Sequence, residues 1–205
     1  MKLQPPHATL LLLLALSGCH ATSQPVRPIS QTTRAKIVAG ARAQLGIGYD
    51  PAYVKLAYPG GDVAKNTGVC TEVVIRALRT VGRDLQVLIH EDMARNFPLY
   101  PSRKKWGLKR PDKNIDHRRV LNQMVFFRRF GTELTKVVSN KTLPQWQPGD
   151  IVCWDLNGHG QTHTGILTEK KSSAGWPFVV HNLGSCREEN VLGAWKIIGH
   201  FRYPK

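Results

Sequence analysis

The chain has 205 residues, and its 29 lysines and arginines outnumber its 14 aspartates and glutamates, which gives a formal net charge of +15. After one apolar run near its start, the sequence contains no second long hydrophobic stretch and no internal repeat. These features argue against a protein with several membrane spans and against a repeat array. They predict one domain over residues 33–205, which is long enough to bury a hydrophobic core.

The N-terminus has the layout of a signal peptide over residues 1–18. Lys2 precedes an apolar run, Leu10–Leu16, that is too short for an ordinary transmembrane helix. The tetrapeptide LSGC, which ends at Cys19, resembles the bacterial lipobox. The resemblance implies cleavage before Cys19 and lipidation of its sulfur with diacylglycerol. A plain secretory signal cleaved near Ala21 is the alternative.

A polar, proline-containing segment, residues 19–32, predicts a flexible tether. His20 takes a place where enteric bacteria tend to use Asp to retain a lipoprotein at the inner membrane, which favours the outer membrane. We therefore expect a periplasmic monomer anchored to the membrane through lipid. Its positive charge favours peptidoglycan or another anionic envelope polymer as partner, and not nucleic acid, which an exported protein rarely meets. A solvated basic face that binds nothing specific is the alternative.

Helices come first along the domain and strands come later. Apolar residues recur at helical spacing in residues 33–45 and 70–81, and cap or stop residues predict two further helices, over residues 88–97 and 115–130. Short runs rich in β-branched and aromatic residues then predict four strands, over residues 151–156, 162–168, 178–183 and 195–203. This order predicts an α+β domain in which N-terminal helices pack on a C-terminal antiparallel sheet.

A cysteine at the start of a helix opens the candidate site. Residues 66–73 (NTGVCTEV) run from turn residues into a predicted helix, so Cys70 lies where free N–H groups and the helix dipole stabilise a thiolate. Strands that carry His163 and His181-Asn182 can bring these side chains to the same site. His163 would then act as the base, and either His181 or Asn182 would orient it. The alternative is a small buried cysteine and two histidines of the core or surface.

Longer stretches of the sequence resemble known families. Four motifs within residues 33–203 resemble the NlpC/P60 branch of the papain-like cell-wall peptidases. They are a helix-opening cysteine, W-x-PGD with two apolar residues, H-x-G, and a later His after two apolar residues. Four longer stretches resemble one bacterial family more narrowly, domain of unknown function 1287. They are GVCTEVVIRALR, IHEDMARNFPLYP, PDKNIDHRRVLN and QPGDIVCWDL. The resemblance implies a papain-like α+β fold and an exported enzyme that acts on peptide or amide bonds. It also implies catalytic Cys70 and His163, with His181 as the third polar residue.

The chain departs from the NlpC pattern in two places. VCTE replaces the usual Asp-Cys-Ser-Gly around the nucleophile, and the segment 83–138 between the catalytic helix and the strands is longer than in simple members. Because of these two differences, the substrates of NlpC enzymes cannot be carried over to this chain.

Further residues are candidates for supporting roles. Tyr49, in the loop before the catalytic helix, can supply a hydroxyl as tyrosines often do in the superfamily, or can simply pack in its loop. Arginine binds carboxylates bidentately, and peptidoglycan stem peptides are rich in carboxylates. Polar clusters therefore suggest substrate contacts, and the candidates are Glu72, Asp92, Asp116, His117 and Arg118. The alternative is a helix cap with a solvated basic face.

Three cysteines remain if the first is lipidated, and we expect Cys153 and Cys186, both in the C-terminal half, to form a disulfide. His159 and His163 have the spacing of a zinc-binding helix, but Gly160 and the strand context oppose a helix there. We therefore expect no metal and no cofactor. Five tryptophans either belong mostly to the core or line a sugar-binding cleft; these are Trp106, Trp146, Trp154, Trp176 and Trp195.

Together these features predict a cysteine hydrolase of the envelope that cleaves an amide bond in peptidoglycan stem peptides. The γ-D-glutamyl–diaminopimelate bond is the superfamily default, and the amide between muramic acid and alanine is the next option. Two alternatives stay open: an acyltransferase or amidase on another envelope substrate, and a non-catalytic basic module that binds the envelope.

Overall fold

The computed structural model of the protein describes Met1 and residues 29–205. The predicted signal peptide, Cys19 and most of the tether lie outside the described residues. The helices are α1 (Gln31–Arg42), α2 (Cys70–Arg79), α3 (Leu85–Asn96), α4 (Ser102–Trp106) and α5 (Val120–Phe130), with short 3₁₀ turns η1 (Phe97–Leu99), η2 (Asp116–Arg118) and η3 (Leu143–Gln145). The strands are β1 (Gly48–Tyr49), β2 (Thr67–Gly68), β3 (Thr132–Glu133), β4 (Ile151–Asp155), β5 (Thr162–Lys171), β6 (Pro177–Asn182), β7 (Cys186–Glu189) and β8 (Lys196–Arg202).

The last two residues of the predicted tether are helical. Ser30 caps α1 by accepting a hydrogen bond from the backbone N–H of Thr33, so the helix begins at Gln31. The domain therefore starts two residues before the predicted boundary at Thr33.

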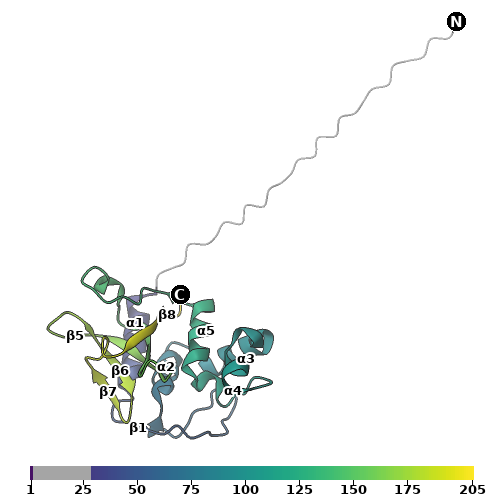
Figure 1. Cartoon of the computed structure of the whole chain (residues 1–205), viewed down its shortest axis with the longest axis horizontal. Coiled ribbons are helices and arrows are strands. Elements are labelled where there is room, and N and C mark those ends of the chain that lie inside the picture. Colours follow the sequence, from purple (N-terminus) through teal and green to yellow (C-terminus); the bar gives the residue numbers. More distant parts are fainter. Residues whose placement is uncertain (2–28) are drawn as a thin grey trace.

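A six-stranded antiparallel sheet forms one layer, in the order β3-β8-β4-β5-β6-β7. Helices α1, α2 and α5 lie against this sheet (Figure 1). The prediction of an α+β domain with N-terminal helices on a C-terminal antiparallel sheet is confirmed.

Helix α2 is the central helix of the core. Val73, Val74, Ala77 and Leu78 have almost no exposed surface and pack into the main hydrophobic cluster, which includes Ile166 of β5. Burying each of the larger apolar side chains stabilises the fold by about 1.5–3 kcal/mol relative to leaving it in water. This packing fixes the start of α2 against the sheet.

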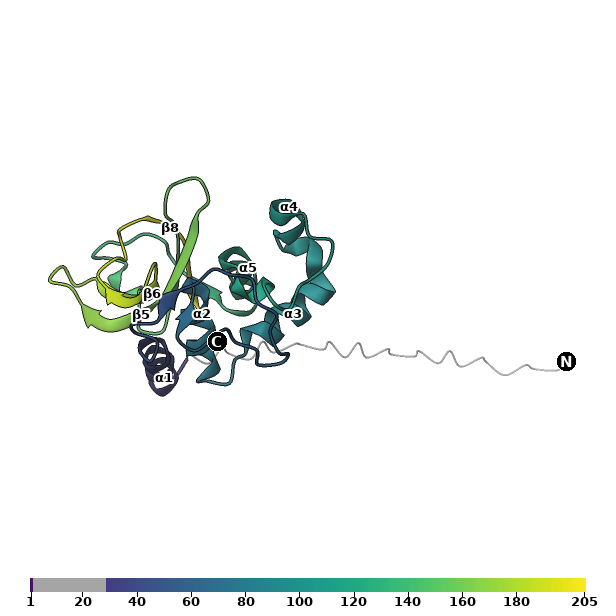
Figure 2. The ribbon, with the colours of Figure 1, turned by 90° about the horizontal axis from the view of Figure 1, so that it is seen from below.

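The insert between α2 and the sheet forms a lobe beside the main body, in which α3 and α4 lie away from the strands (Figure 2). This lobe contacts α2 through α3 and η2. It supplies one wall of the pocket at the start of α2.

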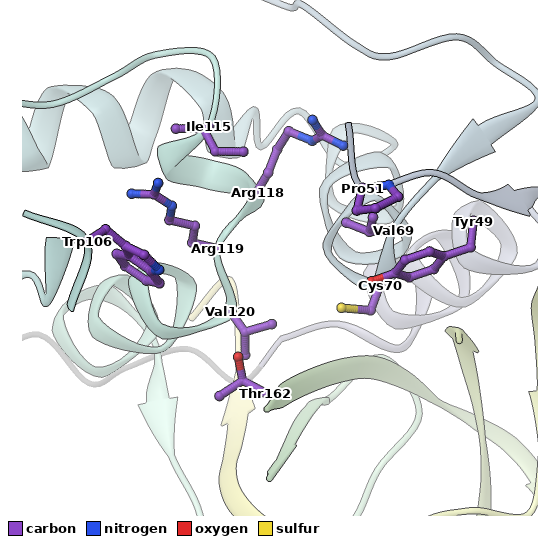
Figure 3. Close-up of a pocket in the computed structure, with 10 residues that line it drawn as sticks. All are labelled: Tyr49, Pro51, Val69, Cys70, Trp106, Ile115, Arg118, Arg119, Val120 and Thr162. Carbon is purple, nitrogen blue, oxygen red and sulfur yellow. The ribbon is translucent and has the colours of Figure 1, made fainter. Parts of the chain in front are cut away.

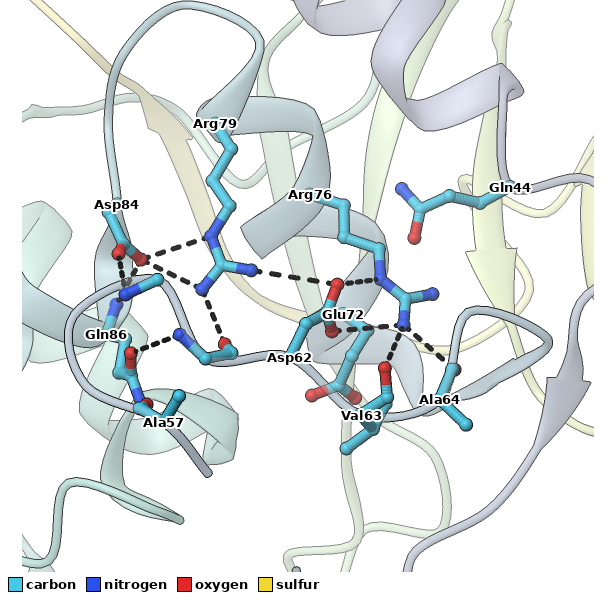
Figure 4. A network of polar contacts seen from close by, with 12 residues as sticks. Gln44, Ala57, Asp62, Val63, Ala64, Glu72, Arg76, Arg79, Asp84 and Gln86 are labelled. Atoms are coloured by element: carbon cyan, nitrogen blue, oxygen red, sulfur yellow. Dashed lines mark hydrogen bonds and ion pairs between the residues drawn. The ribbon is translucent and has the colours of Figure 1, made fainter. Parts of the chain in front are cut away.

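Two arginines on the outer side of α2 hold the long loop between β1 and β2 (Figure 4). Arg76 binds Asp62 through two hydrogen bonds of 2.8 and 3.0 Å and also donates to the carbonyl of Thr67. Arg79 donates to the carbonyl of Gly61 and binds Asp84, the N-cap of α3. The loop that leads into the helix start is therefore fastened along its length.

A second, smaller core lies on the other face of the sheet. Trp146 and Trp154 are buried there, and Trp176 and Trp195 pack against them. These four tryptophans belong to this core, whereas Trp106 lines the pocket. None of the helices within residues 29–205 is both long and apolar enough to cross a bilayer.

Candidate active site

A pocket of about 220 Å³ opens at the N-terminal end of α2 (Figure 3). Its walls come from four parts of the chain. The lining residues are Tyr49 of β1 and Pro51 just after it, Val69 and Cys70 at the start of α2, Trp106, Ile115, Arg118, Arg119 and Val120 of the insert, and Thr162 of β5. The Cys70 side chain points into this pocket.

Cys70 is the first residue of α2, and its neighbours shape the helix start. Glu72 reaches back and accepts a hydrogen bond of 2.8 Å from the backbone N–H of Val69. Burial raises the pKa of the Cys70 thiol to about 12, although backbone N–H groups of Thr164 and Thr71 pull it down. The free protein therefore holds Cys70 as a thiol, with donors already in place for a thiolate.

His163 lies on β5, but it does not line the pocket, and within residues 29–205 no hydrogen bond joins it to Cys70. Its neighbour Thr162 does line the pocket, and the backbone N–H of Thr164 acts to lower the pKa of the Cys70 thiol. The His163 ring is buried beside Trp154, with ring centroids 5.6 Å apart. Burial, together with the neighbouring His181, lowers the pKa of His163 to about 3, so the imidazole is neutral at physiological pH.

The two histidines form a hydrogen-bonded chain that ends on a carboxylate. Nε2 of His163 lies 2.9 Å from Nδ1 of His181, and Nε2 of His181 lies 3.1 Å from Oε2 of Glu189 on β7. A carboxylate on Nε2 of His181 favours the N–H tautomer there, which leaves Nδ1 as the acceptor for His163. His163 then donates from Nε2, and its Nδ1 is left as a base.

A glycine allows the strands of the two histidines to approach closely. Gly165 pairs with His181 across β5 and β6. A Cβ at this position would lie 2.8 Å from the carbonyl oxygen of Val180 and 2.6 Å from Cγ1 of Val179. A larger residue would push β6 away and stretch the contact between His163 and His181.

His181, and not Asn182, contacts His163. The Asn182 side chain points to the opposite face and donates to the carbonyls of Ile47, Gly48 and Gly68, so it ties the β1–β2 pair to the sheet. Tyr49 lines the pocket, and its hydroxyl is directed toward Cys70 (Figure 3). Burial raises the pKa of Tyr49, so its hydroxyl is a donor at neutral pH.

The structure does not bring most of the predicted substrate-binding residues to the pocket. Asp92 is buried in a cluster with Arg129 and Tyr100. Asp116 and His117 are buried within the lobe. Arg118 lines the pocket, but its Nε lies 2.6 Å from Oε1 of buried Glu72. These side chains therefore have internal structural roles, since burial leaves Glu72, Asp92, Asp116 and His117 no surface to offer a substrate.

The predicted disulfide between Cys153 and Cys186 is wrong, because both are free thiols. Cys153 lies on β4, where its sulfur is 3.5 Å from the hydroxyl of Thr164, and Cys186 begins β7 at the far end of the sheet order. Within residues 29–205, no three His, Cys, Asp or Glu side chains are placed to hold a metal ion.

Sequence reasoning missed three residues of the site. Glu189 belongs to β7, a strand whose sequence CREE lacks the apolar alternation of its neighbours. Trp106 ends the short helix α4, and Arg119 follows the η2 turn. The only signal for Arg119 is its place beside Arg118 in the DHRR cluster.

Comparison with known proteins places this chain among bacterial relatives. A family model described as Domain of unknown function (DUF1287) matches residues 38–203. The uncharacterized protein YijF of Escherichia coli (strain K12) is 48% identical over 202 residues, which cover 95% of this chain and 96% of YijF. The narrower of the two resemblances is therefore confirmed, and the link to the NlpC/P60 branch stays a prediction.

Two crystal structures of an N-acetylmuramoyl-L-alanine amidase from Bacteroides uniformis ATCC 8492 are similar in fold. One has a TM-score of 0.53 and 12% identity over 83% of this chain and 98% of the amidase chain. The other has a TM-score of 0.50 and 14% identity over 85% and 100% of the two chains. At these identities the likeness shows a shared fold.

Proposed function

The chain belongs to the family Domain of unknown function (DUF1287), and we propose that it is a cysteine hydrolase that cleaves an amide bond in peptidoglycan. The observation that carries the proposal is the pocket at the start of α2, into which the Cys70 side chain points, together with the hydrogen-bonded chain from Glu189 through His181 to His163 on β5, the strand that contributes Thr162 to that pocket. A nucleophile, a base and an orienting group are the parts of a cysteine hydrolase site. The similar fold of an N-acetylmuramoyl-L-alanine amidase, seen in two crystal structures, supports peptidoglycan as the substrate.

The proposed reaction has two steps. In the first, His163 takes the Cys70 proton as the sulfur attacks the amide carbonyl carbon, and the same proton then passes to the leaving amine. This step requires the His163 ring to turn toward Cys70, because among the described residues no hydrogen bond joins the two side chains. In the second, His163 takes a proton from water as the water oxygen attacks the thioester carbonyl. The C–S bond then breaks, the carboxylic acid leaves, and His163 returns the proton to the sulfur, which restores the Cys70 thiol. The backbone N–H of Cys70, in the first turn of α2, and the Tyr49 hydroxyl are donors for the oxyanion.

The bond cleaved is proposed to be the amide between muramic acid and L-alanine, because the two crystal structures of similar fold are described as an N-acetylmuramoyl-L-alanine amidase. The alternative within the same chemistry is the γ-D-glutamyl–diaminopimelate bond. The two bonds give different products, since the first releases the whole stem peptide and the second leaves a dipeptide on muramic acid.

The test is digestion of purified peptidoglycan, with products identified by mass spectrometry. We expect fragments from the wild-type protein and none from Cys70→Ala. Cys186→Ala is the matched control, because it removes a buried thiol that does not line the pocket. Equal digestion by Cys70→Ala and wild type would refute the cysteine mechanism. Absence of digestion by a folded wild-type protein would refute the substrate and favour an acyltransferase or a binding module.

We also propose that the protein works in the periplasm, anchored to the outer membrane by lipid on Cys19. The proposal rests on the leader sequence, and the net charge of +15 fits an anionic wall. Metabolic labelling with a fatty acid tests it. Wild type should be labelled and should fractionate with outer membranes, whereas Cys19→Ala should lose the label. A labelled Cys19→Ala variant would contradict the anchor.

A further inference from the structure

Two neighbouring arginines, Arg118 and Arg119, line the pocket with Cys70, and they differ in how far internal hydrogen bonds occupy them. Arg118 donates to Oε1 of Glu72 at 2.6 Å and to the carbonyl of Ala52 at 2.9 Å. Its side chain is almost fully buried, with 2% of its surface exposed. Arg118 therefore holds the lobe on α2 and has little capacity left for a ligand.

Arg119 is held in place by its neighbours, but part of its guanidinium makes no hydrogen bond among the described residues. Its guanidinium lies over the indole of Trp106, 4.1 Å from the ring centroid, and 18% of its side chain is exposed. Its Nη1 is buried and has no hydrogen-bond partner among the described residues. The neighbouring carboxylate of Asp116 is 3.7 Å away, and the facing Oδ1 of Asp116 is itself without a hydrogen-bond partner.

The position of Arg119 defines what kind of group it would meet. Trp106 and Arg119 lie on one side of the pocket, and Tyr49 and Cys70 lie on the other (Figure 3). A substrate whose amide reaches Cys70 therefore extends toward the guanidinium. A planar group with five N–H donors matches a carboxylate, and the exposed part of the guanidinium is the part that a ligand in the pocket can reach.

We propose that Arg119, stacked on Trp106, binds a carboxylate of the substrate and makes the enzyme selective for acidic peptides. The inference rests on the proposed function, since it places the scissile amide at Cys70. Stem peptides of peptidoglycan carry a free α-carboxylate on D-glutamate and further carboxylates on diaminopimelate. Amidation of these groups removes the negative charge that Arg119 would bind.

The experiment measures binding and cleavage separately. The probes are a purified disaccharide tripeptide with free carboxylates and the same molecule with its carboxylates converted to carboxamides. Binding is measured by calorimetry on Cys70→Ala, which cannot turn the probe over, and cleavage is measured on the protein with Cys70 intact. Each background also carries Arg119→Gln, Arg119→Lys or the control Arg110→Gln. The control removes one exposed positive charge from the same lobe outside the pocket.

We expect the free carboxylate form to bind about ten- to a hundredfold more tightly than the carboxamide, as for one charge-assisted hydrogen-bonded pair. Arg119→Gln should abolish this ratio, Arg119→Lys should keep part of it, and Arg110→Gln should leave it unchanged. An equal loss in Arg110→Gln would mean that overall charge attracts the probe, and would overturn the role of Arg119. Unchanged selectivity in folded Arg119→Gln and Arg119→Lys variants would also overturn it.

The two proposals fail in different ways. Selective binding through Arg119 without cleavage by the wild type would keep the carboxylate site and refute the hydrolase. Cleavage that depends on Cys70 but treats both probes alike would keep the hydrolase and refute the carboxylate site.

Discussion

The buried ion pair between Glu72 and Arg118 joins helix α2 to the lobe, and its removal should lower the stability of the fold. Both side chains are nearly inaccessible, with 3% and 2% of their surfaces exposed, and Nε of Arg118 lies 2.6 Å from Oε1 of Glu72. Glu72→Gln leaves the guanidinium buried without its counter-charge. Removing one partner of such a pair typically costs about 3–5 kcal/mol. A domain of this size is stable by only about 5–15 kcal/mol.

Urea denaturation of the purified protein, followed by circular dichroism, measures the effect. At a slope of about 2 kcal/mol/M, a loss of about 4 kcal/mol lowers the urea midpoint by about 2 M. The double variant Glu72→Gln/Arg118→Met should lose less than the sum of the single variants, because it leaves no buried charge unpaired.

The exposed pair between Arg128 and Glu133 provides a matched control. Its side chains are 42% and 38% exposed, so Arg128→Met should change stability by no more than about 1 kcal/mol. If Glu72→Gln and Arg118→Met also cost less than about 1 kcal/mol each, or if their costs simply add, the buried pair does not hold the lobe as argued.

Three further predictions concern titration and thiols. Burial pushes the pKa of Asp150 up, but hydrogen bonds from Arg202 and His200 outweigh it and hold the pKa below its ordinary 3.8. The stability that this provides is present above pH 3.8 and is lost as the pH falls below it, so the stability deficit of Asp150→Asn in urea denaturation should be largest at neutral pH and should shrink in acid. A constant deficit from pH 7 to pH 2 would contradict this reasoning. Burial raises the pKa of Cys70 to about 12, so its alkylation by iodoacetamide should be slow at pH 7 and should accelerate steadily into the alkaline range. Mass spectrometry of the alkylated peptide measures the rate. A rate plateau between pH 6 and 8 would instead show a thiolate in the free protein. Cys153 and Cys186 should both react with a thiol reagent once the unreduced protein is denatured, and a disulfide-linked peptide between them would count against the structure.

The main elements of the fold were predictable because their sequence patterns are determined by burial. The helix predicted over 70–81 is observed at Cys70–Arg79, since its apolar positions all face one core. The strand that carries His163 was likewise visible as a run rich in β-branched residues. The observed strand extends to Lys171, beyond the predicted end at residue 168. The prediction missed these last residues because they are exposed and lysine-rich, so they lack an apolar pattern.

Other elements were not predictable because their pairing is decided by distant parts of the chain. Strand β7 has only one apolar residue, Cys186, and it forms because β6 offers a free edge. The predicted helix over 115–130 begins only at Val120, since residues 116–118 form a 3₁₀ turn. Pairing of Glu189 with His181, like the pairing of Arg118 with Glu72, joins residues whose proximity no local pattern encodes.

The candidate site could be predicted in its chemistry but not in its accessibility. Cys70 was singled out from its position at a helix start, and it lines the pocket, whereas the catalytic roles of Cys70, His163 and His181 stay predictions. The acidic candidates Asp92 and Asp116 were chosen for their charge, yet the fold buries both of them. A sequence shows that a charged residue is present, but only the packing of the lobe shows which charges still face an open pocket.

The chain enters the domain at the end of the molecule opposite the pocket. In Figure 1 the start of α1 lies near the top beside the C-terminus, whereas β1 and the start of α2 lie at the bottom. If Cys19 carries the lipid that the leader predicts, the membrane attachment and the pocket face opposite directions. A protein attached in this way would be held through the end of the domain away from its pocket, so the pocket would stay free to meet the polymer beyond the membrane.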